Sequence, residues 1–192
     1  MRFVLPRVIY GNRGDLASRW GVLTSLEKIN IENVTVFCQF SEDIPDFNYR
    51  RCGYGKLRNF FWTREGRKAI IESDIVLWSV GLDMQDDSSL AKLVYLWLLF
   101  HRFRLMGKKI IVLFQGAGPI STFWGRKLAT GILNCVDIFV ARDPGTYRLI
   151  DSLNNKTHVI LGQDAIFLKG FEKYLTIENS PEKISGLLDV SD

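Results

Sequence analysis

The sequence predicts an α/β fold, in which a mostly parallel, Rossmann-like open sheet carries helices on both faces. Short apolar runs recur along the chain, and Ile110 to Phe114 contains no polar residue, as in a strand that is buried on both faces. Glycine or polar residues end each run, and segments with helical spacing follow. This order of strand, loop and helix is typical of a doubly wound sheet.

Length and composition are those of a soluble globular domain. The chain has 192 residues, of which 47% are hydrophobic and 24% are charged. A net charge of +4 is too mild to indicate a nucleic-acid partner. Pro6 and Arg7 interrupt any apolar core of a secretory signal, so we expect a cytoplasmic protein.

Neither the cysteines nor the histidines form a recognisable site. Cys38, Cys52 and Cys135 lack metal-type spacing and a paired framework, which predicts reduced thiols. His101 falls in a helix and His158 at the amino end of a strand, so no catalytic triad can be assembled. We therefore expect no metal and no cofactor.

The first predicted unit joins a strand ending at Val8 to Tyr10 with a glycine loop, Gly11 to Asp15. Asp15 is placed to cap the following helix, which carries Leu16 and Leu26 on its apolar face. Free backbone N–H groups at such a helix start can bind an anion, although Asp15 could equally serve only as the cap.

A second strand is predicted over Val34 to Phe40 and a third over Ile75 to Trp78, after a short helix from Arg64 to Ser73. Between them, Ser41 to Thr63 mixes basic and aromatic residues. That mixture could bind a nucleic acid or a sugar phosphate, but a solvated loop anchored by a few rings is the favoured interpretation.

The loop after the third strand carries three carboxylates. Such a cluster could bind Mg²⁺ or supply a general base. Asp87 or Ser88 is expected to cap the long helix from Leu90 to about Met106, which leaves Asp83 and Asp86 as the better candidates for chemistry.

Within that helix, Leu93 to Phe100 is the most apolar stretch of the chain, yet it is too short to span a bilayer. We expect a buried helix. The alternative is an interfacial membrane contact assisted by the basic residues that follow, Arg102, Arg104, Lys108 and Lys109.

Polar residues recur at the ends of the later strands. The central strand runs into Gln115-Gly116-Ala117-Gly118-Pro119, and a helix capped by Ser121 or Thr122 follows to about Asn134. Strands over residues 138–141 and 158–161 end in Arg142-Asp143-Pro144-Gly145, with Asp143 as N-cap, and in Gly162-Gln163-Asp164. The carboxyl ends of parallel strands meet at one edge, where ligands gather, so we expect these polar residues on a common rim. Arg142 could pair with an anion there or form a salt bridge that holds its loop.

In this order the loops resemble the N-terminal half of the polysaccharide pyruvyl transferase family. Gly11 to Asp15 resembles the family's Asn-x-Gly-Asp loop, and Gln85-Asp86 with Ser89 resembles Gln-Asp-x-x-Ser. Gln115 to Ile120 is similar to Gln-Gly-x-Gly-Pro. Further similarities are Arg142-Asp143 and Asp164-Ala165-Ile166-Phe167, whereas Ser79-Val80-Gly81 replaces the family's glycine triplet.

The resemblance implies one half of a GT-B-like architecture. It implies an enzyme of polysaccharide biosynthesis that transfers a pyruvyl group from phosphoenolpyruvate to two sugar hydroxyls, giving a ketal. Residues 1–170 would form the N-terminal domain and residues 171–192 the start of a linker or second domain. We then expect a truncated chain, or one that needs a partner copy. The acceptor would be a sugar or glycan, free or lipid-linked, at a peripheral membrane contact on the inner face.

The same resemblance supplies the predicted site. Asp15 and Asp86 would be catalytic, with Asp86 as a base or an anchor, and Asn12 with Asp15 would orient sugar hydroxyls. The remaining predicted substrate-binding residues are Arg13, Gly14, Gly81, Gln85, Gln115, Gly116, Gly118, Arg142 and Asp164. The alternatives are a GT-B glycosyltransferase that uses a nucleotide sugar and a non-catalytic carbohydrate-binding module.

Overall fold

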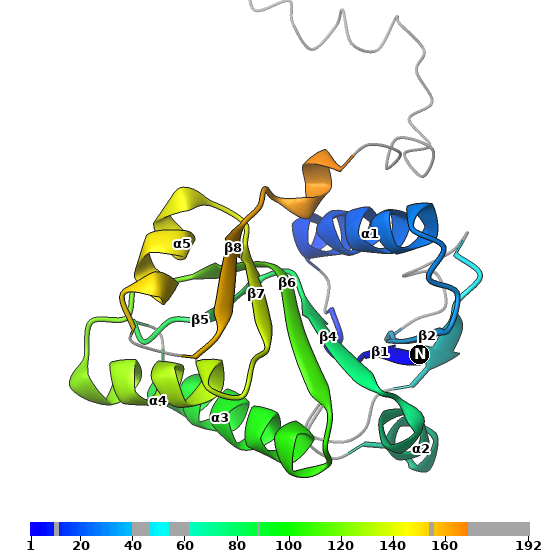
Figure 1. Ribbon diagram of the computed structural model, residues 1–192, viewed down its shortest axis with the longest axis horizontal. Helices are drawn as coiled ribbons and strands as arrows, with labels where there is room; N and C mark the ends of the chain where they lie inside the picture. The colour runs from blue at the N-terminus through cyan, green and yellow to red at the C-terminus, as the bar shows by residue number, and fades with distance from the viewer. Residues whose placement is uncertain (10–11, 40–46, 54–61, 88, 154–155, 169–192) are drawn as a thin grey trace, which may run out of the picture.

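The computed structural model describes residues 1–9, 12–39, 47–53, 62–87, 89–153 and 156–168. Within them, eight strands form a parallel sheet in the order β3-β2-β1-β4-β6-β7-β8, and β5 pairs with β6 beyond the end of β4 (Figure 1). Five α-helices and a short 3₁₀ helix connect and cover the strands of this described part. The predicted α/β class with a mostly parallel open sheet is confirmed.

The strands are short, and most are apolar. Central strand β6 pairs with β4 on one side and β7 on the other, whereas β1 lies between β2 and β4. Every side chain of β4 is buried, as expected for a strand covered on both faces. The strands are β1 Phe3–Leu5, β2 Val34–Phe37, β3 Arg50–Cys52, β4 Ile75–Ser79, β5 Leu82–Met84, β6 Lys109–Ala117, β7 Ile138–Ala141 and β8 His158–Leu161.

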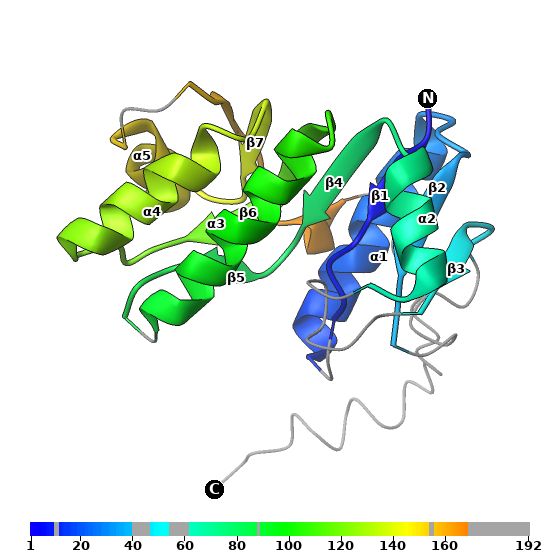
Figure 2. The same cartoon turned by 90° about the horizontal axis from the view of Figure 1, so that it is seen from below.

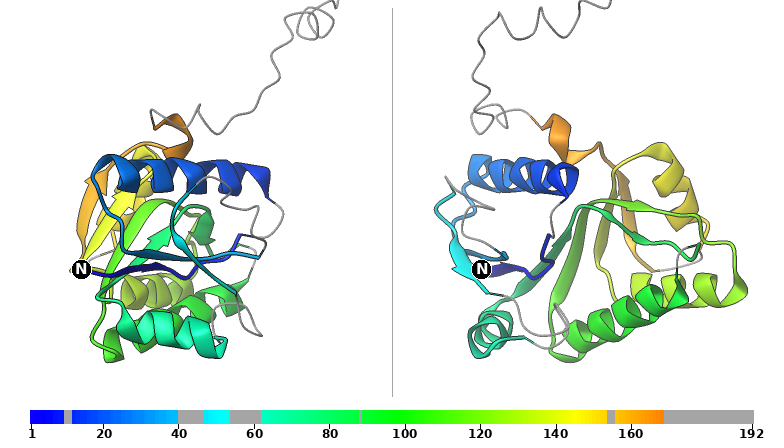
Figure 3. Two further views of the ribbon diagram at one scale, coloured as in Figure 1. Left: turned by 90° about the vertical axis from the view of Figure 1, so that its right-hand side faces the viewer. Right: turned by 180° about the vertical axis from the view of Figure 1, so that it is seen from behind.

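Helices cover both faces of the sheet. Figure 1 shows α1 across the sheet from α2, α3 and α4, and Figure 3 shows the 3₁₀ helix η2 beside one end of α1. Two separate apolar cores result, one under α1 and η2 and the other under α2 to α5. The helices are α1 Arg13–Lys28, α2 Arg64–Glu72, α3 Leu90–Leu105, α4 Phe123–Leu133, α5 Pro144–Asp151 and η2 Ala165–Phe167.

The direction of winding reverses between β1 and β4. The chain goes from β1 through α1 to β2 on one side, and from β4 through α3 to β6 on the other. In open α/β sheets such a reversal opens a crevice outside the carboxyl ends of the two strands. We call the edge at which the strands end the carboxyl edge, and the opposite edge the amino edge.

Three predicted details were wrong. The first strand is Phe3–Leu5 and not Val8 to Tyr10, because Pro6 follows the strand and cannot continue its hydrogen bonds. Asn12, not Asp15, caps α1, and Ser89 caps α3 in place of Asp87 or Ser88. Asn and Ser accept the amide hydrogen bonds of a helix start as well as Asp does, so sequence alone does not choose among them.

Two strands were missed. β3 holds two exposed arginines in three residues, and β5 is a three-residue strand within the predicted acidic loop. Neither carries an apolar run that would reveal it. Most of the predicted basic and aromatic loop, and the predicted segment 171–192, lie outside the described residues. Within the described part, no helix is both long and apolar enough to cross a membrane.

Candidate functional site

The carboxyl edge at the reversal point is built around Arg7, which follows β1. Its Nε donates a 2.7 Å hydrogen bond to Asp83 Oδ2, and its Nη2 lies 3.4 Å from Asp15 Oδ2. Asp83 belongs to β5 and Asp15 to the first turn of α1. One guanidinium therefore joins the loop after β4 to the start of α1.

The Arg7–Asp83 pair is buried and ionised. Burial by itself favours the neutral carboxyl, but the charge and hydrogen bonds of Arg7 outweigh it and hold the pKa of Asp83 below its ordinary value. The same partner raises the pKa of Arg7 against the opposing effect of burial. Trp78 Nε1 also donates to Asp83, at 3.2 Å, and Lys92 Nζ lies 3.2 Å from it. The carboxylate is thus fully engaged, which fixes Arg7 in place.

Two glycines allow two arginines to approach the backbone. A Cβ on Gly81 would lie 2.3 Å from Arg7 Nη2, and one on Gly116 would lie 2.7 Å from Arg142 Nε. Gly116 N donates to Gly81 O at 3.0 Å, and Gln115 Nε2 donates to the same oxygen at 3.0 Å. The two guanidinium groups therefore rest on neighbouring, hydrogen-bonded glycines.

The backbone beneath this pair is strained. Val80 and Phe114 have φ values of 59° and 52°, in the left-handed region that side chains rarely adopt, and Val80 N donates to Leu113 O. Such strain costs about 1–3 kcal/mol per residue and clusters at functional sites. The buried atoms Ser79 Oγ, Gln115 Oε1 and Arg7 Nη1 have no hydrogen-bond partner within the described chain. Both features single out this part of the carboxyl edge as a candidate functional site.

Arg142 is the more accessible of the two arginines. One third of its side chain is exposed, compared with 13% for Arg7. Its contacts with Asp143 and Asp164 are long, at 3.5 and 3.8 Å. Asp164 is held from α1, since Ser18 Oγ donates to it at 2.9 Å. Arg142 can therefore turn toward a ligand without leaving a buried carboxylate unpaired.

The side chain of Asp86 is held by hydrogen bonds to the residues that precede α4. It accepts four hydrogen bonds, from the backbone N–H groups and the hydroxyls of Ser121 and Thr122, where α4 begins. These bonds, with that of the Thr122 hydroxyl first, lower the pKa of Asp86 from its ordinary 3.8 to about 2. None of its contacts within the described residues reaches Arg7 or Arg142. Asp86 is an anchor for the loop between β6 and α4, and its predicted catalytic role stays a prediction.

The residues at the start of α1 differ in what they contact. The side-chain oxygen of Asn12 accepts from Gly14 N and Asp15 N, so this oxygen caps the helix. Arg13 and Gly14 are exposed beside it, and Asp15 is partly exposed and faces Arg7. Among these four described residues, Asp15 is the one whose side chain contacts Arg7 at the reversal point.

The predicted site residues thus divide into three groups. Contacts join one group around the two arginines: Asp15, Gly81, Gln115, Gly116, Arg142 and Asp164. A second group lies in the loops between β5, β6 and α4, where Gly118 N donates to Met84 O: Gln85, Asp86 and Gly118. The third group is exposed at the start of α1: Asn12, Arg13 and Gly14. Sequence reasoning missed Arg7 and Ser18. Arg7 was missed because the first strand was predicted to end at Val8 to Tyr10, whereas β1 ends at Leu5 and Arg7 follows it; Ser18, on a helix, offered no signal.

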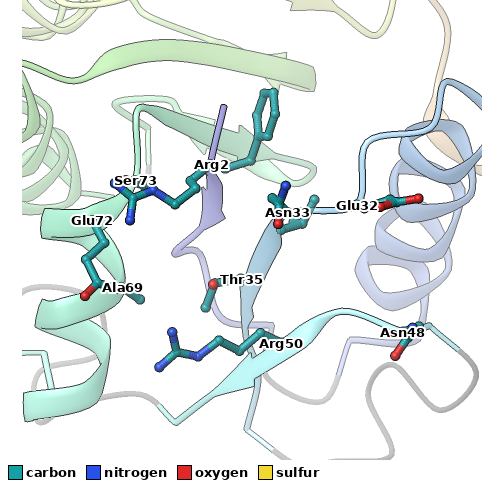
Figure 4. Close-up of a pocket in the computed structure, with 11 residues that line it drawn as sticks. Arg2, Glu32, Asn33, Thr35, Asn48, Arg50, Ala69, Glu72 and Ser73 are labelled. Atoms are coloured by element: carbon teal, nitrogen blue, oxygen red, sulfur yellow. The ribbon is translucent and has the colours of Figure 1, made fainter.

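A separate pocket lies toward the amino edge. About 330 Å³ in volume, it is bounded by the first residues of β1 and β2 and by the end of α2 (Figure 4). It carries both cationic and acidic side chains, Arg2 and Arg50 with Glu32 and Glu72, and none of the predicted site residues. Within the described residues no cluster of His, Cys, Asp or Glu is suited to a metal ion.

The family model for polysaccharide pyruvyl transferase matches residues 12–189, most of the chain. The chain belongs to the polysaccharide pyruvyl transferase family. The match begins at Asn12 and includes the loops that carry Asp15, Gly81, Gln115 and Arg142. No curated protein sequence matched the chain. Membership of the polysaccharide pyruvyl transferase family, together with the parallel sheet, indicates a transferase.

Proposed function

We propose that the carboxyl edge binds phosphoenolpyruvate beside a sugar and forms a pyruvate ketal on two sugar hydroxyls. The observation that supports this proposal best is the pair of guanidinium groups, Arg7 and Arg142, on the hydrogen-bonded Gly81 and Gly116. Phosphoenolpyruvate carries two anionic groups, and guanidinium forks bind carboxylate and phosphate in bidentate geometry.

The chemistry needs a proton, two hydroxyls and a leaving phosphate. A proton adds to the methylene carbon of the donor and makes it a methyl group. A sugar hydroxyl attacks the resulting cationic carbon and loses its proton, and a second hydroxyl displaces inorganic phosphate from the same carbon. The two hydroxyl protons balance the one taken up by the methyl group and the one carried by phosphate.

The described residues divide these tasks. Arg142, partly exposed and weakly paired, contacts an anionic group of the donor. Asp15, held by Arg7, accepts a hydrogen bond from a sugar hydroxyl and orients it. Arg7 supplies a second, fixed positive charge on Gly81 and holds Asp15 in place, because its partner Asp83 is buried and fully engaged. Asp86 holds the loop between β6 and α4.

Binding of the donor to the purified chain is the direct test. We expect phosphoenolpyruvate to bind in isothermal titration calorimetry, and Arg142→Gln to weaken it about tenfold to a hundredfold, because hydrogen bonds to charged groups contribute about 1.5–3 kcal/mol. Arg142→Lys should retain part of the affinity, since lysine keeps the charge without the fork. Addition of a sugar acceptor panel should then release phosphate.

Arg104→Gln is the matched control, because Arg104 is also paired with a carboxylate but lies at the end of α3. It should leave donor binding unchanged. Binding of a nucleotide sugar, with no response to phosphoenolpyruvate, would overturn the proposal in favour of a glycosyltransferase. Glycan binding that never releases phosphate would instead support a carbohydrate-binding module.

A further inference from the structure

Helix α3 is apolar on its outer side as well as its inner side. Leu93, Leu96, Leu99, Phe100 and Phe103 are buried beneath it. On the opposite side, four large apolar side chains are exposed, and Leu105 is 89% exposed. Their spacing of four, four and seven residues places them in one stripe along the helix: Leu90, Val94, Leu98 and Leu105.

Helix α4, which packs beside α3, also carries exposed aromatic side chains. Phe123 and Trp124, in its first turn, are 64% and 63% exposed, and their rings pack edge to face at 5.5 Å. The two helices are in direct contact, since Trp97 of α3 lies against Gly131 of α4. Figure 2 shows α3 and α4 side by side on the near face. We call this surface the α3–α4 face: Leu90, Val94, Leu98, Leu105, Phe123 and Trp124.

The charges on these two helices have a single sign. Neither α3 nor α4 contains Asp or Glu, whereas together they carry Lys92, Arg102, Arg104, Arg126 and Lys127. Asp83 pairs with Lys92 and Asp137 with Arg104. Lys127 Nζ lies 4.6 Å from the centre of the Phe123 ring and 5.6 Å from that of Trp124. A cation therefore stands directly beside the exposed aromatic rings.

We propose that the α3–α4 face docks on an anionic lipid bilayer. An apolar stripe with aromatic rings, on helices whose own charged residues are all basic, is the pattern by which helices lie in a membrane interface. Each Lys or Arg near an anionic leaflet adds about 1 kcal/mol, which is about fivefold in binding. The proposal does not depend on which donor the carboxyl edge takes. Docking there would bring the carboxyl edge, from which α3 and α4 start, close to lipid headgroups.

Vesicle co-sedimentation of the full chain tests the proposal. We expect binding to vesicles of equimolar phosphatidylglycerol and phosphatidylcholine, weak binding to phosphatidylcholine alone, and loss of binding as salt is raised. Lys127→Gln should weaken binding to the anionic vesicles about fivefold. Leu98→Ser with Trp124→Ser should weaken it more than about tenfold, because two exposed apolar groups no longer insert.

Matched controls come from α1 on the opposite face of the sheet. Lys28→Gln removes an exposed cation at the end of α1, and Ile29→Ser removes an apolar side chain that is 65% exposed. Neither should change vesicle binding. Each variant should fold, because all the changed side chains are exposed in the described structure. Circular dichroism and urea unfolding verify this.

Three outcomes would overturn the proposal. The first is no binding to anionic vesicles by the full chain. The second is equal binding to both kinds of vesicle, which would show that the charge of the lipid does not contribute to binding. The third is self-association in analytical ultracentrifugation that Leu98→Ser with Trp124→Ser abolishes, because the α3–α4 face would then be an interface between copies. Phosphoenolpyruvate binding is measured without vesicles, so the two proposals can fail separately.

Discussion

The two edges of the sheet use charged side chains in opposite ways. At the amino edge, three charged side chains hold backbone: Lys108 Nζ donates to Ile71 O and Ser73 O, and Asp74 and Asp137 accept N–H bonds from Arg2 and Ile110. At the carboxyl edge, Arg7 and Arg142 pair with carboxylates above bare glycine backbone.

The two edges of the sheet also differ in backbone conformation. Val80 and Phe114 adopt left-handed conformations at the carboxyl edge, and buried polar atoms beside them lack partners within the described chain. Strain of this kind persists only where the surroundings impose it, and it accompanies binding sites. The amino edge is built to close turns, whereas the carboxyl edge keeps charge available at some cost in stability.

Neutralising one carboxylate at each edge should give the largest difference in stability between the two edges. Asp83→Asn leaves the buried Arg7 with only the longer contact to Asp15, and should lower the free energy of unfolding by about 3–5 kcal/mol. Asp137→Asn breaks the exposed Arg104 pair at the amino edge and should cost less than about 1 kcal/mol. Urea denaturation measures both, and equal losses would contradict the distinction.

Two glycines with positive φ give a sharper comparison. Gly81 has φ +92° and lies against Arg7, whereas Gly107, at φ +71° between α3 and β6, has nothing within 4 Å of a built Cβ. Gly107→Ala should cost about 1–2 kcal/mol from backbone strain alone. Gly81→Ala adds a clash with the guanidinium and should cost about 1–3 kcal/mol more. A similar cost for both substitutions, again by urea unfolding, would show that Arg7 moves aside freely.

The smallest expected effect is on the free energy of unfolding at acidic pH. The pKa of Asp86 is lowered to about 2 in the folded chain, so its contribution is complete above its unfolded pKa near 3.8 and is lost as pH falls toward 2. The free energy of unfolding should therefore fall between about pH 4 and pH 2, and Asp86→Asn should flatten that slope.

Asp74→Asn at the amino edge is the control for this titration. Asp74 accepts one backbone hydrogen bond, from Arg2, which lowers its pKa, and it is less enclosed than Asp86. Its replacement should flatten the acid slope less. Measurement of unfolding by urea at several acidic pH values compares the three proteins, and an unchanged slope in Asp86→Asn would refute the assigned cause.

Local pattern predicted most of the fold. Strands β7 and β8 occupy the predicted residues, α4 lies within a residue or two of its predicted limits, and α5 begins after its predicted cap, Asp143. Apolar runs and caps are short-range signals, so they survive in any context. β1, β3 and β5 are three residues long, and their pairing comes from neighbouring strands far away in the sequence.

Part of the candidate site was predictable for the same reason. Residues at or just beyond the carboxyl ends of strands, such as Gln115, Arg142 and Asp164, could be assigned to one edge from the order of strands and loops. The different environments of Asp15 and Asp86 could not be predicted from the sequence. Both carboxylates come after strands, and they differ only in the side chains and amides that they contact. Arg7 engages Asp15, whereas the start of α4 engages Asp86.

The sequence by itself determined the class of fold, the family and the edge that carries the polar loops, since all three are written in local motifs and their order. The tertiary structure alone decided which charges are buried together, which arginine can reach a ligand and which helix faces stay uncovered. These depend on contacts between residues far apart in the chain, such as Arg7 with Asp83 and Ser18 with Asp164. Such contacts are fixed by packing, and no local pattern encodes them.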